Sequence, residues 1–527
     1  MTKHCLILTS RYYDSVTLMN VARDLQDTLG VEDAALLMGT DANKGLLQQT
    51  DLLTAVAEGA TPNDLIIALK GNKKGIKAAL ERVEILLTRT SRSESGSQKW
   101  NPKTLRTAIR TQGDANLAVI SVAGRYAAAE SMDALRAGLN VLLFSDNVPI
   151  EDELALKRYA VEHDLFLMGP GAGTSILNGV ALGFANALPP GPVGIVSAAG
   201  TGLQEVSCIL AREGVGVSQG IGVGGRDLSD EIDGLMTLHA LKVLQDDPDT
   251  EVIVAISKIP SPTVAQKVLT KLTSNNKPSV VIFMGESPSS SKTKKAIHEG
   301  LYLANTLEEA ALAAAALARK ENVEQVVFHL EEQKRKLEGR AREIVSRLQP
   351  EQKYLRGLFS GGTLCEEAMR IWEAEVGPVW SNAPLNPEYT LPDSHKSSEH
   401  TAVDLGEEEF TVGRPHPMID HDLRTRRLYH EAQDPNVALI QMDVVLGYGA
   451  HPDPASALAP AIEKARNIAE KDGRALAVVL SITGTKGDPQ GFDRQREAFE
   501  ICGAIVAESN AAASILAAMI IHLHALT

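Results

Sequence analysis

The sequence contains few aromatic residues, four scattered cysteines and no regular metal-ligand spacing. Phe, Trp and Tyr make up only 4% of its 527 residues, so the core must be mostly aliphatic. Many short runs of Val, Ile, Ala and Leu are typical of parallel strands buried on both faces. The cysteines, at positions 5, 208, 365 and 502, form no CxxC pair, which excludes a disulfide framework and a structural zinc site. No metal site is expected.

The sequence also lacks a membrane span, a secretory leader and a basic stripe. No apolar run reaches the roughly 18 residues that a membrane helix needs, and the N-terminus reads as a first strand at 5–9 rather than as a signal peptide. A net charge of −15 argues against nucleic acid as the main partner. A cytoplasmic protein with neither membrane nor nucleic acid as partner is predicted.

The chain is long enough for three or four domains, and strand and helix patterns alternate along most of it. The predicted fold class is α/β, with three doubly wound parallel-sheet domains: a Rossmann-like domain at 1–186 and two flavodoxin-like domains at 187–322 and 353–527. A Ser-rich, charged stretch at 90–103 is expected to be a surface loop. The segment 323–352 reads as a charged, amphipathic linker helix.

Two glycine-rich turns connect a strand to a helix. The first, VGIVSAAGTGLQE at 193–205, places Ala199, Gly200, Thr201 and Gly202 at the start of the helix, where free N–H groups and the helix dipole favour an anion. It lacks the lysine of an ATP-binding P-loop. The second, RGLFSGGTLCEE at 356–367, repeats this order with Gly361, Gly362 and Thr363. The two turns could share one anion, or each could serve only close packing.

Two further segments carry candidate ligand-binding residues. GVGGRDLSDE at 222–231 places Arg226 beside Gly225, where a guanidinium could clamp a carboxylate or phosphate; a surface network of Arg226 with Asp227 or Asp230 is the alternative. In GRPHPMID at 413–420, prolines flank His416 and restrict its backbone. A rigidly placed imidazole suits a general acid/base or an oxyanion stabiliser, although a lone histidine is usually structural or solvated.

The second and third domains resemble parts of the nucleotide-forming acyl-CoA synthetases. GPVGIVSAAGTGLQE and GIGVGGRDL are similar to segments of the succinyl-CoA synthetase α subunit, and FSGGTLCEEAM and VVLGYGAH to segments of the C-terminal domain of the β subunit. The resemblance covers most of the chain from about residue 114 onward. It implies that Glu205 matches the carboxylate that orients a phosphohistidine in those enzymes.

The whole chain more closely resembles the FdrA family, through segments such as YYDSVTLMNVARDL, NVLLFSDNVPIEDELALK and TVGRPHPMID. These proteins are acyl-CoA-synthetase-like, and one resembles the large subunit of an oxamate carbamoyltransferase, which converts oxalurate and phosphate into oxamate and carbamoyl phosphate. The resemblance therefore implies carbamoyl chemistry in allantoin and purine nitrogen metabolism, phosphate as a substrate, and additional protein subunits, a homo-oligomer or both.

Three departures from the synthetases shape the expected mechanism. No GHAGA loop is present, and His298, the only nearby histidine, lacks its glycine context; it is expected to lie outside the anion site. Ser257 and Lys258 stand where the synthetases have a second carboxylate, and no ATP-grasp segment is present. The N-terminal domain also lacks the usual Gly-rich CoA fingerprint, which argues against CoA.

The resulting hypothesis is a subunit that transfers a carbamoyl or acyl group to phosphate. The two turns would hold phosphate, Arg226, Lys258 and Arg414 would neutralise negative charge, and His416 or Glu205 would move a proton. Two alternatives remain: an acyl-CoA synthetase that borrows its ATP-grasp domain from a separate chain, and a non-catalytic subunit that binds a regulatory anion. The candidate catalytic residues are His416, Glu205 and Arg414. The candidate phosphate- or substrate-binding residues are Ala199, Gly200, Thr201, Gly202, Gly225, Arg226, Lys258, Gly361, Gly362 and Thr363.

Overall fold

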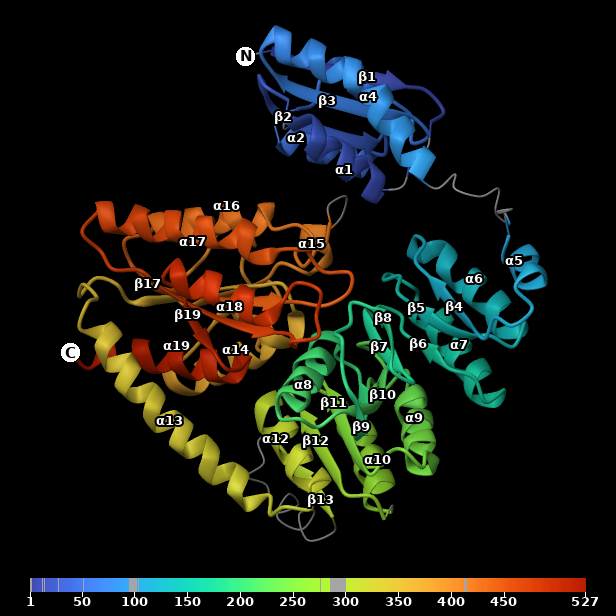
Figure 1. Cartoon of the computed structure of the whole chain (residues 1–527), viewed down its shortest axis with the longest axis vertical. Helices are drawn as coiled ribbons and strands as arrows, with labels where there is room; N and C mark the ends of the chain where they lie inside the picture. The colour runs from blue at the N-terminus through green and yellow to red at the C-terminus, as the bar shows by residue number, and fades with distance from the viewer. Residues whose placement is uncertain are drawn as a thin grey trace. The chain divides into compact units, whose positions relative to one another are not determined.

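The chain divides into two compact units (Figure 1). The computed structural model describes residues 2–11, 13, 15–26, 28–50, 52–93, 102, 104–274, 276–284, 300–411 and 415–527. Unit 1 comprises Met1–Pro102 and Glu408–Pro415, and unit 2 comprises Lys103–Glu407 and His416–Thr527. Within the described ranges, no helix has both the length and the apolar character needed to cross a membrane.

Unit 1 is built on a three-stranded antiparallel sheet in the order β1-β3-β2. Its central strand reads LIIAL and is buried on both faces. Leu65, Ile67 and Leu69 pack into one core, whereas Ile66 and Ala68 pack into another, as the two-residue period of a strand requires. The elements of this unit are β1 (Thr2–Leu8), α1 (Ser15–Gln26), β2 (Val31–Met38), α2 (Asp41–Gln49), α3 (Ala55–Glu58), β3 (Leu65–Gly71), α4 (Lys73–Ser93) and α15 (Glu408–Thr411).

The expectation of parallel strands is wrong for this part of the chain. Strands β1 and β2 run parallel to each other and are joined by a helix, as predicted, but β3 lies between them and is antiparallel to both. A central strand gives the same continuous apolar run in either orientation, so the sequence pattern does not distinguish the two pairings. Helix α4 also continues to Ser93, into the segment that was expected to be a loop.

Unit 2 begins with a small parallel sheet in the order β4-β5-β6. The region expected to be one Rossmann-like domain at 1–186 therefore holds two separate sheets and the start of a third. The small sheet shares one core with the next domain, where Leu143 and Met168 pack with Met236 and Leu244. Its elements are α5 (Leu105–Thr111), β4 (Leu117–Ile120), α6 (Gly124–Arg136), β5 (Asn140–Leu143), α7 (Ile150–Glu162) and β6 (Leu167–Met168).

The second sheet of unit 2 has seven strands in the order β13-β12-β11-β9-β10-β7-β8. Its parallel part, β9 to β13, has the flavodoxin-like order 2-1-3-4-5, and the antiparallel hairpin β7–β8 extends the β10 edge. The elements are β7 (Thr174–Leu177), β8 (Val180–Gly183), β9 (Pro190–Ser197), α8 (Gly200–Arg212), β10 (Val217–Gly222), α9 (Leu235–Asp246), β11 (Val252–Ser257), α10 (Pro262–Thr273), β12 (Ser279–Phe283), β13 (Leu301–Leu303) and α12 (Leu307–Ala318).

The third sheet has six parallel strands in the order β15-β16-β14-β17-β18-β19, the same flavodoxin-like order with β15 added at one edge. Helix α13 (Glu324–Val345) leads into it and lies within the segment expected to be a linker helix. The other elements are β14 (Tyr354–Phe359), α14 (Gly362–Val376), β15 (Trp380–Ser381), η2 (Pro387–Tyr389), β16 (Thr401–Asp404), α16 (Asp422–Gln433), β17 (Val437–Val445), α17 (Pro454–Lys471), β18 (Ala477–Thr483), α18 (Phe492–Ile501), β19 (Ile505–Ala507) and α19 (Asn510–Ala525).

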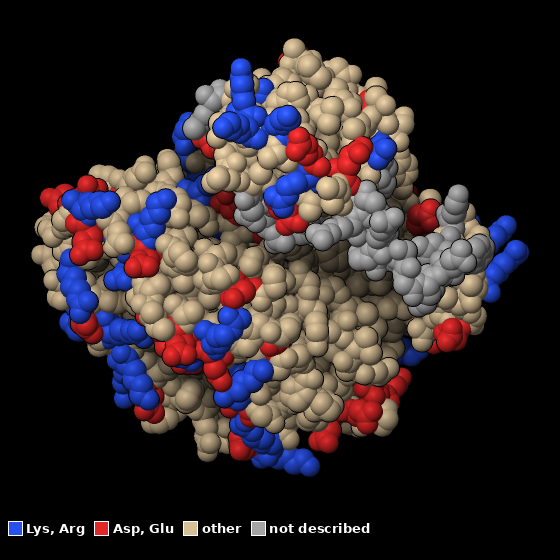
Figure 2. Space-filling model, turned by 45° about the horizontal axis from the view of Figure 1, so that its top comes forward, with Lys and Arg blue, Asp and Glu red and all other residues tan. Residues whose placement is uncertain are grey.

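The two flavodoxin-like domains share a single apolar core. Leu203 of α8 and Leu307 of α12 belong to the same cluster as Leu364 of α14 and Leu516 of α19. These four helices therefore join the two domains, and the predicted α/β class with parallel sheets is confirmed for both. Charged side chains of both signs are interspersed on the face in Figure 2, so local groups, rather than one large patch, must set the electrostatics of a site on that face.

Candidate functional site

Helices α8 and α14 both begin without a side-chain cap. Their N-cap residues are Ala199 and Gly361, and neither offers a side-chain acceptor to the first N–H groups. By contrast, Ser261, Thr306 and Ser509 cap α10, α12 and α19 with their hydroxyl groups. An uncapped helix start keeps backbone donors available for an anion.

The two uncapped turns lie directly against each other. A Cβ atom added to Gly361 would lie 2.7 Å from Cγ2 of Thr201, and one added to Gly202 would lie 3.1 Å from Cγ2 of Thr363. Each threonine thus covers the glycine of the other turn. Both turns follow the first strand of a 2-1-3-4-5 sheet, where such sheets bind ligands. The helix starts therefore meet at the junction of the two domains, as the parallel order of residues in the two segments suggested.

Replacing Gly361 by alanine is expected to destabilise the protein by about 1–3 kcal/mol, because the new methyl group overlaps Thr201. The backbone of Gly361 is extended, so the cost comes from crowding rather than from strain. Gly339 of α13 has no atom within 4 Å of its added Cβ, and Gly339→Ala should stabilise by about 0.5–1 kcal/mol. Equilibrium urea unfolding of both variants measures the difference; a neutral Gly361→Ala would show that the turns are loosely packed.

A carboxyl group and an amino group lie at the start of α14. Oδ2 of Asp404 would be 2.5 Å, and Nζ of Lys258 3.6 Å, from a Cβ added to Gly362. Asp404 ends β16 and Lys258 directly follows β11, so both occupy the carboxyl edges of their sheets. Among the described residues, the Lys258 amino group has no hydrogen-bond or ion-pair partner. An unpartnered cation beside an uncapped helix start is suited to a bound anion.

Asp404 is buried and holds its proton unusually tightly. Burial raises its pKa to about 7, Glu407 adds to the rise, and Lys258 opposes it. One oxygen, Oδ1, accepts a hydrogen bond of 2.9 Å from the Gly406 amide. Its carboxyl group can therefore be protonated near neutral pH and could donate a proton within the site.

His416 approaches the same place from the loop after β16. Its Nε2 atom would lie 2.9 Å from a Cβ added to Gly406, and Oδ1 of Asp404 would lie 3.1 Å from that point. Nδ1 accepts a hydrogen bond of 3.2 Å from the Met418 amide, which assigns the proton to Nε2. Burial lowers its pKa to about 4. The imidazole is therefore neutral and presents an N–H donor to the site, while the Phe184 ring lies 5.6 Å from it.

A buried ion pair between Arg424 and Asp443 holds the second turn in place. Asp443 accepts hydrogen bonds from the Ser360 amide (2.7 Å) and hydroxyl (2.8 Å). Arg424 donates to Oδ1 of Asp443 (3.1 Å) and to the carbonyl oxygen of Leu358 (3.0 Å). These contacts hold the end of β14 and thus orient the start of α14.

The Glu205 carboxylate does not lie at the paired starts of α8 and α14. It is buried, its Oε1 accepts a hydrogen bond of 3.0 Å from the Asn510 amide, and its Oε2 accepts one of 2.5 Å from the Thr483 hydroxyl. Glu367 similarly accepts from the Leu307 amide (2.7 Å) and the Asn510 side chain (2.8 Å). The structure thus places Glu205 in a buried contact between helix ends, where both of its oxygens are occupied.

Glu367 should make stability depend on pH. Burial raises its pKa from 4.5 to about 7, so the folded state binds more protons than the unfolded state between these values. Stability is therefore gained as pH falls through 7 and lost as pH rises through it. From about pH 8 to about pH 5.5, Glu367 should contribute about 2 kcal/mol. Asp404, whose pKa is also raised to about 7, adds its own gain over this range, so urea unfolding should show a gain about 2 kcal/mol smaller in Glu367→Gln than in the wild type.

The exposed Glu497 on α18 provides a matched control for this comparison. Glu497→Gln should keep the pH-dependent gain of the wild type, because its carboxyl group is not buried. An unchanged gain in Glu367→Gln would contradict the assignment.

Arg226 is held away from the two turns. Its Nη2 donates to the Val148 carbonyl (2.7 Å) and pairs with Glu153 (2.8 Å), rather than with Asp227 or Asp230. Gly225 remains near the first turn, since a Cβ atom added to it would lie 3.9 Å from the Ala198 carbonyl oxygen. Arg414 and His298 lie outside the described residues. The structure thus brings together the two turns, Lys258 and His416, and adds Asp404, whose sequence signal was its position as the last residue of a strand.

Comparisons with known proteins agree with this division of the chain. Residues 1–102 match the AllF heavy metal-associated domain, 190–331 the succinyl-CoA ligase like flavodoxin domain, and 358–520 the CoA-ligase domain. Fold and site therefore define an acyl-CoA-synthetase-like protein. The chain belongs to the same family as the uncharacterized protein YahF of Escherichia coli K12, with 44% identity over 98% of each chain.

More distant relatives match only part of the chain. The Archaeoglobus fulgidus succinate–CoA ligase α subunit 2 is 33% identical over 29% of this chain and 54% of that protein, and the Methylorubrum extorquens malate–CoA ligase α subunit is 30% identical over 31% and 56%. This chain thus spans about half of their length. The dinucleotide-forming acetyl-coenzyme A synthetase 1 of Ca. Korarchaeum cryptofilum aligns with 17% identity and a TM-score of 0.32 over 78% of this chain and 83% of that one.

The description of the N-terminal match refers to heavy metals, but the residues do not fit a metal. In the described part of the chain, no group of three or more His, Cys, Asp or Glu side chains is arranged to hold an ion. Cys5, the one cysteine of unit 1, is buried, and its thiol donates to the Leu52 carbonyl at 3.4 Å. Burial also raises the pKa of this thiol, which disfavours the thiolate that a soft metal needs.

Proposed function

We propose that this chain transfers a carbamoyl or acyl group to phosphate at the paired starts of α8 and α14. The observation that carries the proposal is the unpartnered Lys258 amino group beside Gly362. Backbone N–H groups of both helices and this ammonium group would hold the phosphate dianion. The finer assignment, in which oxalurate and phosphate give oxamate and carbamoyl phosphate, rests on the resemblance to the FdrA family. Additional protein subunits are part of the proposal.

The proposed step forms one bond and breaks one. A phosphate oxygen attacks the carbonyl carbon of the donor, and the carbonyl electron pair moves onto its oxygen, where the His416 Nε2–H group stabilises it. The intermediate then collapses, the bond from carbon to the leaving nitrogen breaks, and the protonated Asp404 carboxyl group gives its proton to that nitrogen. The products are the acyl or carbamoyl phosphate and the free amide.

A second candidate function is supported by the succinyl-CoA ligase and CoA-ligase family matches, which support ligase chemistry more directly than carbamoyl transfer. In this alternative the acyl group moves between phosphate and the thiol of CoA, and a separate ATP-grasp subunit supplies the phosphoryl group. The same helix starts would then hold the phosphate of an acyl phosphate. The two candidates thus share the anion site and differ in the leaving group.

Isotope exchange distinguishes the candidates. The protein, purified with its co-purifying subunits, is incubated with labelled phosphate and either carbamoyl phosphate plus oxamate or acetyl phosphate plus CoA. Label entering carbamoyl phosphate supports the first candidate, and label entering acetyl phosphate only with CoA supports the second. Asp404→Asn should lower either exchange by about 10²-fold or more, with the exposed Asp493→Asn as a control. Phosphate binding without exchange in any mixture would leave only an anion-binding role.

A further inference from the structure

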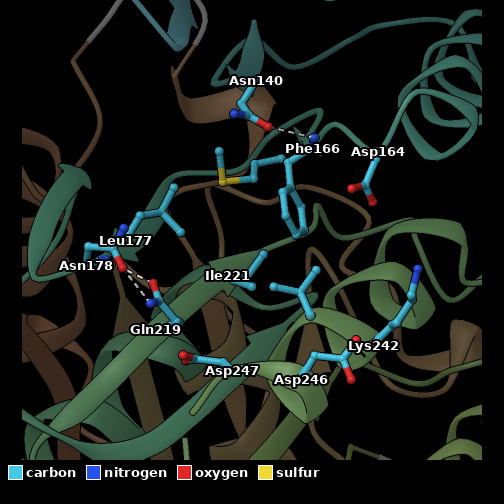
Figure 3. A pocket seen from close by; sticks show the side chains of 12 residues that line it. Asn140, Asp164, Phe166, Leu177, Asn178, Gln219, Ile221, Lys242, Asp246 and Asp247 are labelled. Carbon is cyan, nitrogen blue, oxygen red and sulfur yellow. Dashed lines mark hydrogen bonds between the residues drawn. The ribbon is translucent and has the colours of Figure 1, made fainter. Parts of the chain in front are cut away.

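The structure contains a cavity whose lining includes no residue of the two helix starts (Figure 3). It has a volume of about 530 Å³, within the range of small-molecule sites, and lies between the small β4–β6 sheet on one side and β10 and α9 on the other. Asn140 lines it as the first residue of β5, Asp164 lines it shortly before β6, and Asp246 lines it at the end of α9. It therefore faces the opposite end of these parallel strands from the turn after β9.

The floor of this cavity is apolar. Phe166, Met168, Leu177 and Ile221 contribute side chains to it, and Figure 3 shows the Phe166 ring reaching into the space above Ile221. Behind that ring lies His239, whose ring centroid is 4.8 Å from that of Phe166. His239 is only 7% exposed, and its Nε2 atom has no hydrogen-bond partner. His239 is not one of the lining residues, so it lies behind the apolar floor.

The amide groups of the cavity are already engaged. Gln219 Nε2 donates to Asn178 Oδ1 at 2.7 Å, and its Oε1 accepts from the Asn178 amide at 2.9 Å. Asn140 Oδ1 accepts from the Phe166 amide at 3.0 Å. Asp247 accepts from the Thr250 hydroxyl at 2.7 Å. These groups shape the wall but have little capacity left for a ligand.

The acceptors that remain are two carboxylates on opposite walls. Asp246 has no hydrogen-bond or ion-pair partner among the described residues, and the nearest basic nitrogen to Asp164 is His239 Nε2 at 3.9 Å, beyond hydrogen-bonding distance. Lys242 is the one lysine or arginine among the lining residues. The lining contains Asp164, Asp246 and Asp247 but only this one lysine. The negative charges therefore outnumber the positive one, and the local field favours cations over anions.

We infer that this cavity binds a small organic cation: an amine, amidine or guanidine attached to an apolar group. The apolar part would cover Phe166 and Ile221, and an aromatic face next to a cation adds a favourable cation–π contact. The charged part would donate to Asp164 and Asp246. Because the cavity joins two sheets of unit 2, such a ligand would stabilise their packing.

Calorimetric titration of the full-length protein with benzamidinium tests the inference, with neutral benzamide as the isosteric comparison. Benzamidinium should bind one site with a dissociation constant of about 1 mM or tighter, and benzamide about tenfold more weakly or not at all. The double variant Asp164→Asn, Asp246→Asn should lose about tenfold in affinity for benzamidinium.

Asp133→Asn on the exposed side of α6 is the matched control and should bind like the wild type. Asp164 and Asp246 are exposed, so thermal unfolding should show the double variant to be as stable as the Asp133→Asn control. The inference is overturned if benzamidinium does not bind, if benzamide binds equally well, or if the double variant retains the wild-type affinity. None of these outcomes bears on phosphate exchange at the paired helix starts, which is measured separately.

Discussion

Replacing Lys258 by methionine is expected to lower kcat/KM for phosphate by about 10²–10³-fold. Methionine keeps the length and apolar stem of the side chain but removes the ammonium group that lies beside Gly362 at the start of α14. A charge-assisted donor that meets an oxyanion in a partly buried site is worth this much. Steady-state kinetics with varied phosphate measures the loss.

Lys267 is the matched control for this substitution. It lies on α10, is half-exposed, and already pairs with Asp233 at 2.6 Å, so Lys267→Met should change kcat/KM by less than about twofold. Lys258→Arg should restore part of the activity, because it restores the charge but not the geometry. Wild-type kinetics in a folded Lys258→Met protein would remove the anion site from this position.

Replacing His416 by alanine is expected to lower turnover by about 10²–10³-fold, whereas glutamine should retain activity to within about tenfold. The structure shows why the two should differ: the Met418 amide occupies Nδ1 and burial keeps the ring neutral. The role left to His416 is that of an N–H donor, which a glutamine amide can imitate. Turnover of both variants, with circular dichroism as the folding control, tests this.

The pH dependence of turnover provides an independent check on His416. Because its pKa is lowered to about 4, the ring stays neutral at all pH values well above 4, and no activity change from its ionisation is expected between about pH 5.5 and about pH 8. If His416→Gln is as inactive as His416→Ala, the ring acts as an acid or base instead. Full activity in His416→Ala would exclude both roles.

The sequence predicts the residues of the proposed anion site better than it predicts the proposed proton donor. Glycine-rich turns are visible in the sequence because only a small residue at position 361 permits the close contact with Thr201. Each turn follows the first strand of a flavodoxin-like domain, and ligand sites lie at this edge of such sheets. Lys258 is predicted through the resemblance, because it stands where the synthetases have a second carboxylate. Asp404 is not, because a single Asp at the end of a strand resembles any other, and its raised pKa depends on how deeply other segments bury it.

The misplaced residues share a different cause. The resemblance to the synthetases predicts Glu205 in the site, and the position of Arg226 beside Gly225 predicts it as a ligand-binding residue. Partners far away in sequence nevertheless determine where each side chain lies. Asn510 is 305 residues from Glu205, and Val148, which binds Arg226, is 78 residues away. The prediction of strand orientation in unit 1 was wrong for a similar reason, because the pairing depends on β3, which lies between β1 and β2.

Helix α13 has a consequence for how the paired turns behave on dilution. It is a 22-residue tether that joins the domain bearing α8 to the domain bearing α14 and packs on α19 of the latter. Because the tether keeps both domains in one chain, their association is an intramolecular step. The junction between the two turns therefore forms within one molecule, and the fraction of molecules in which it is formed does not depend on protein concentration. Cleaving the backbone within α13 would turn that assembly into a second-order process.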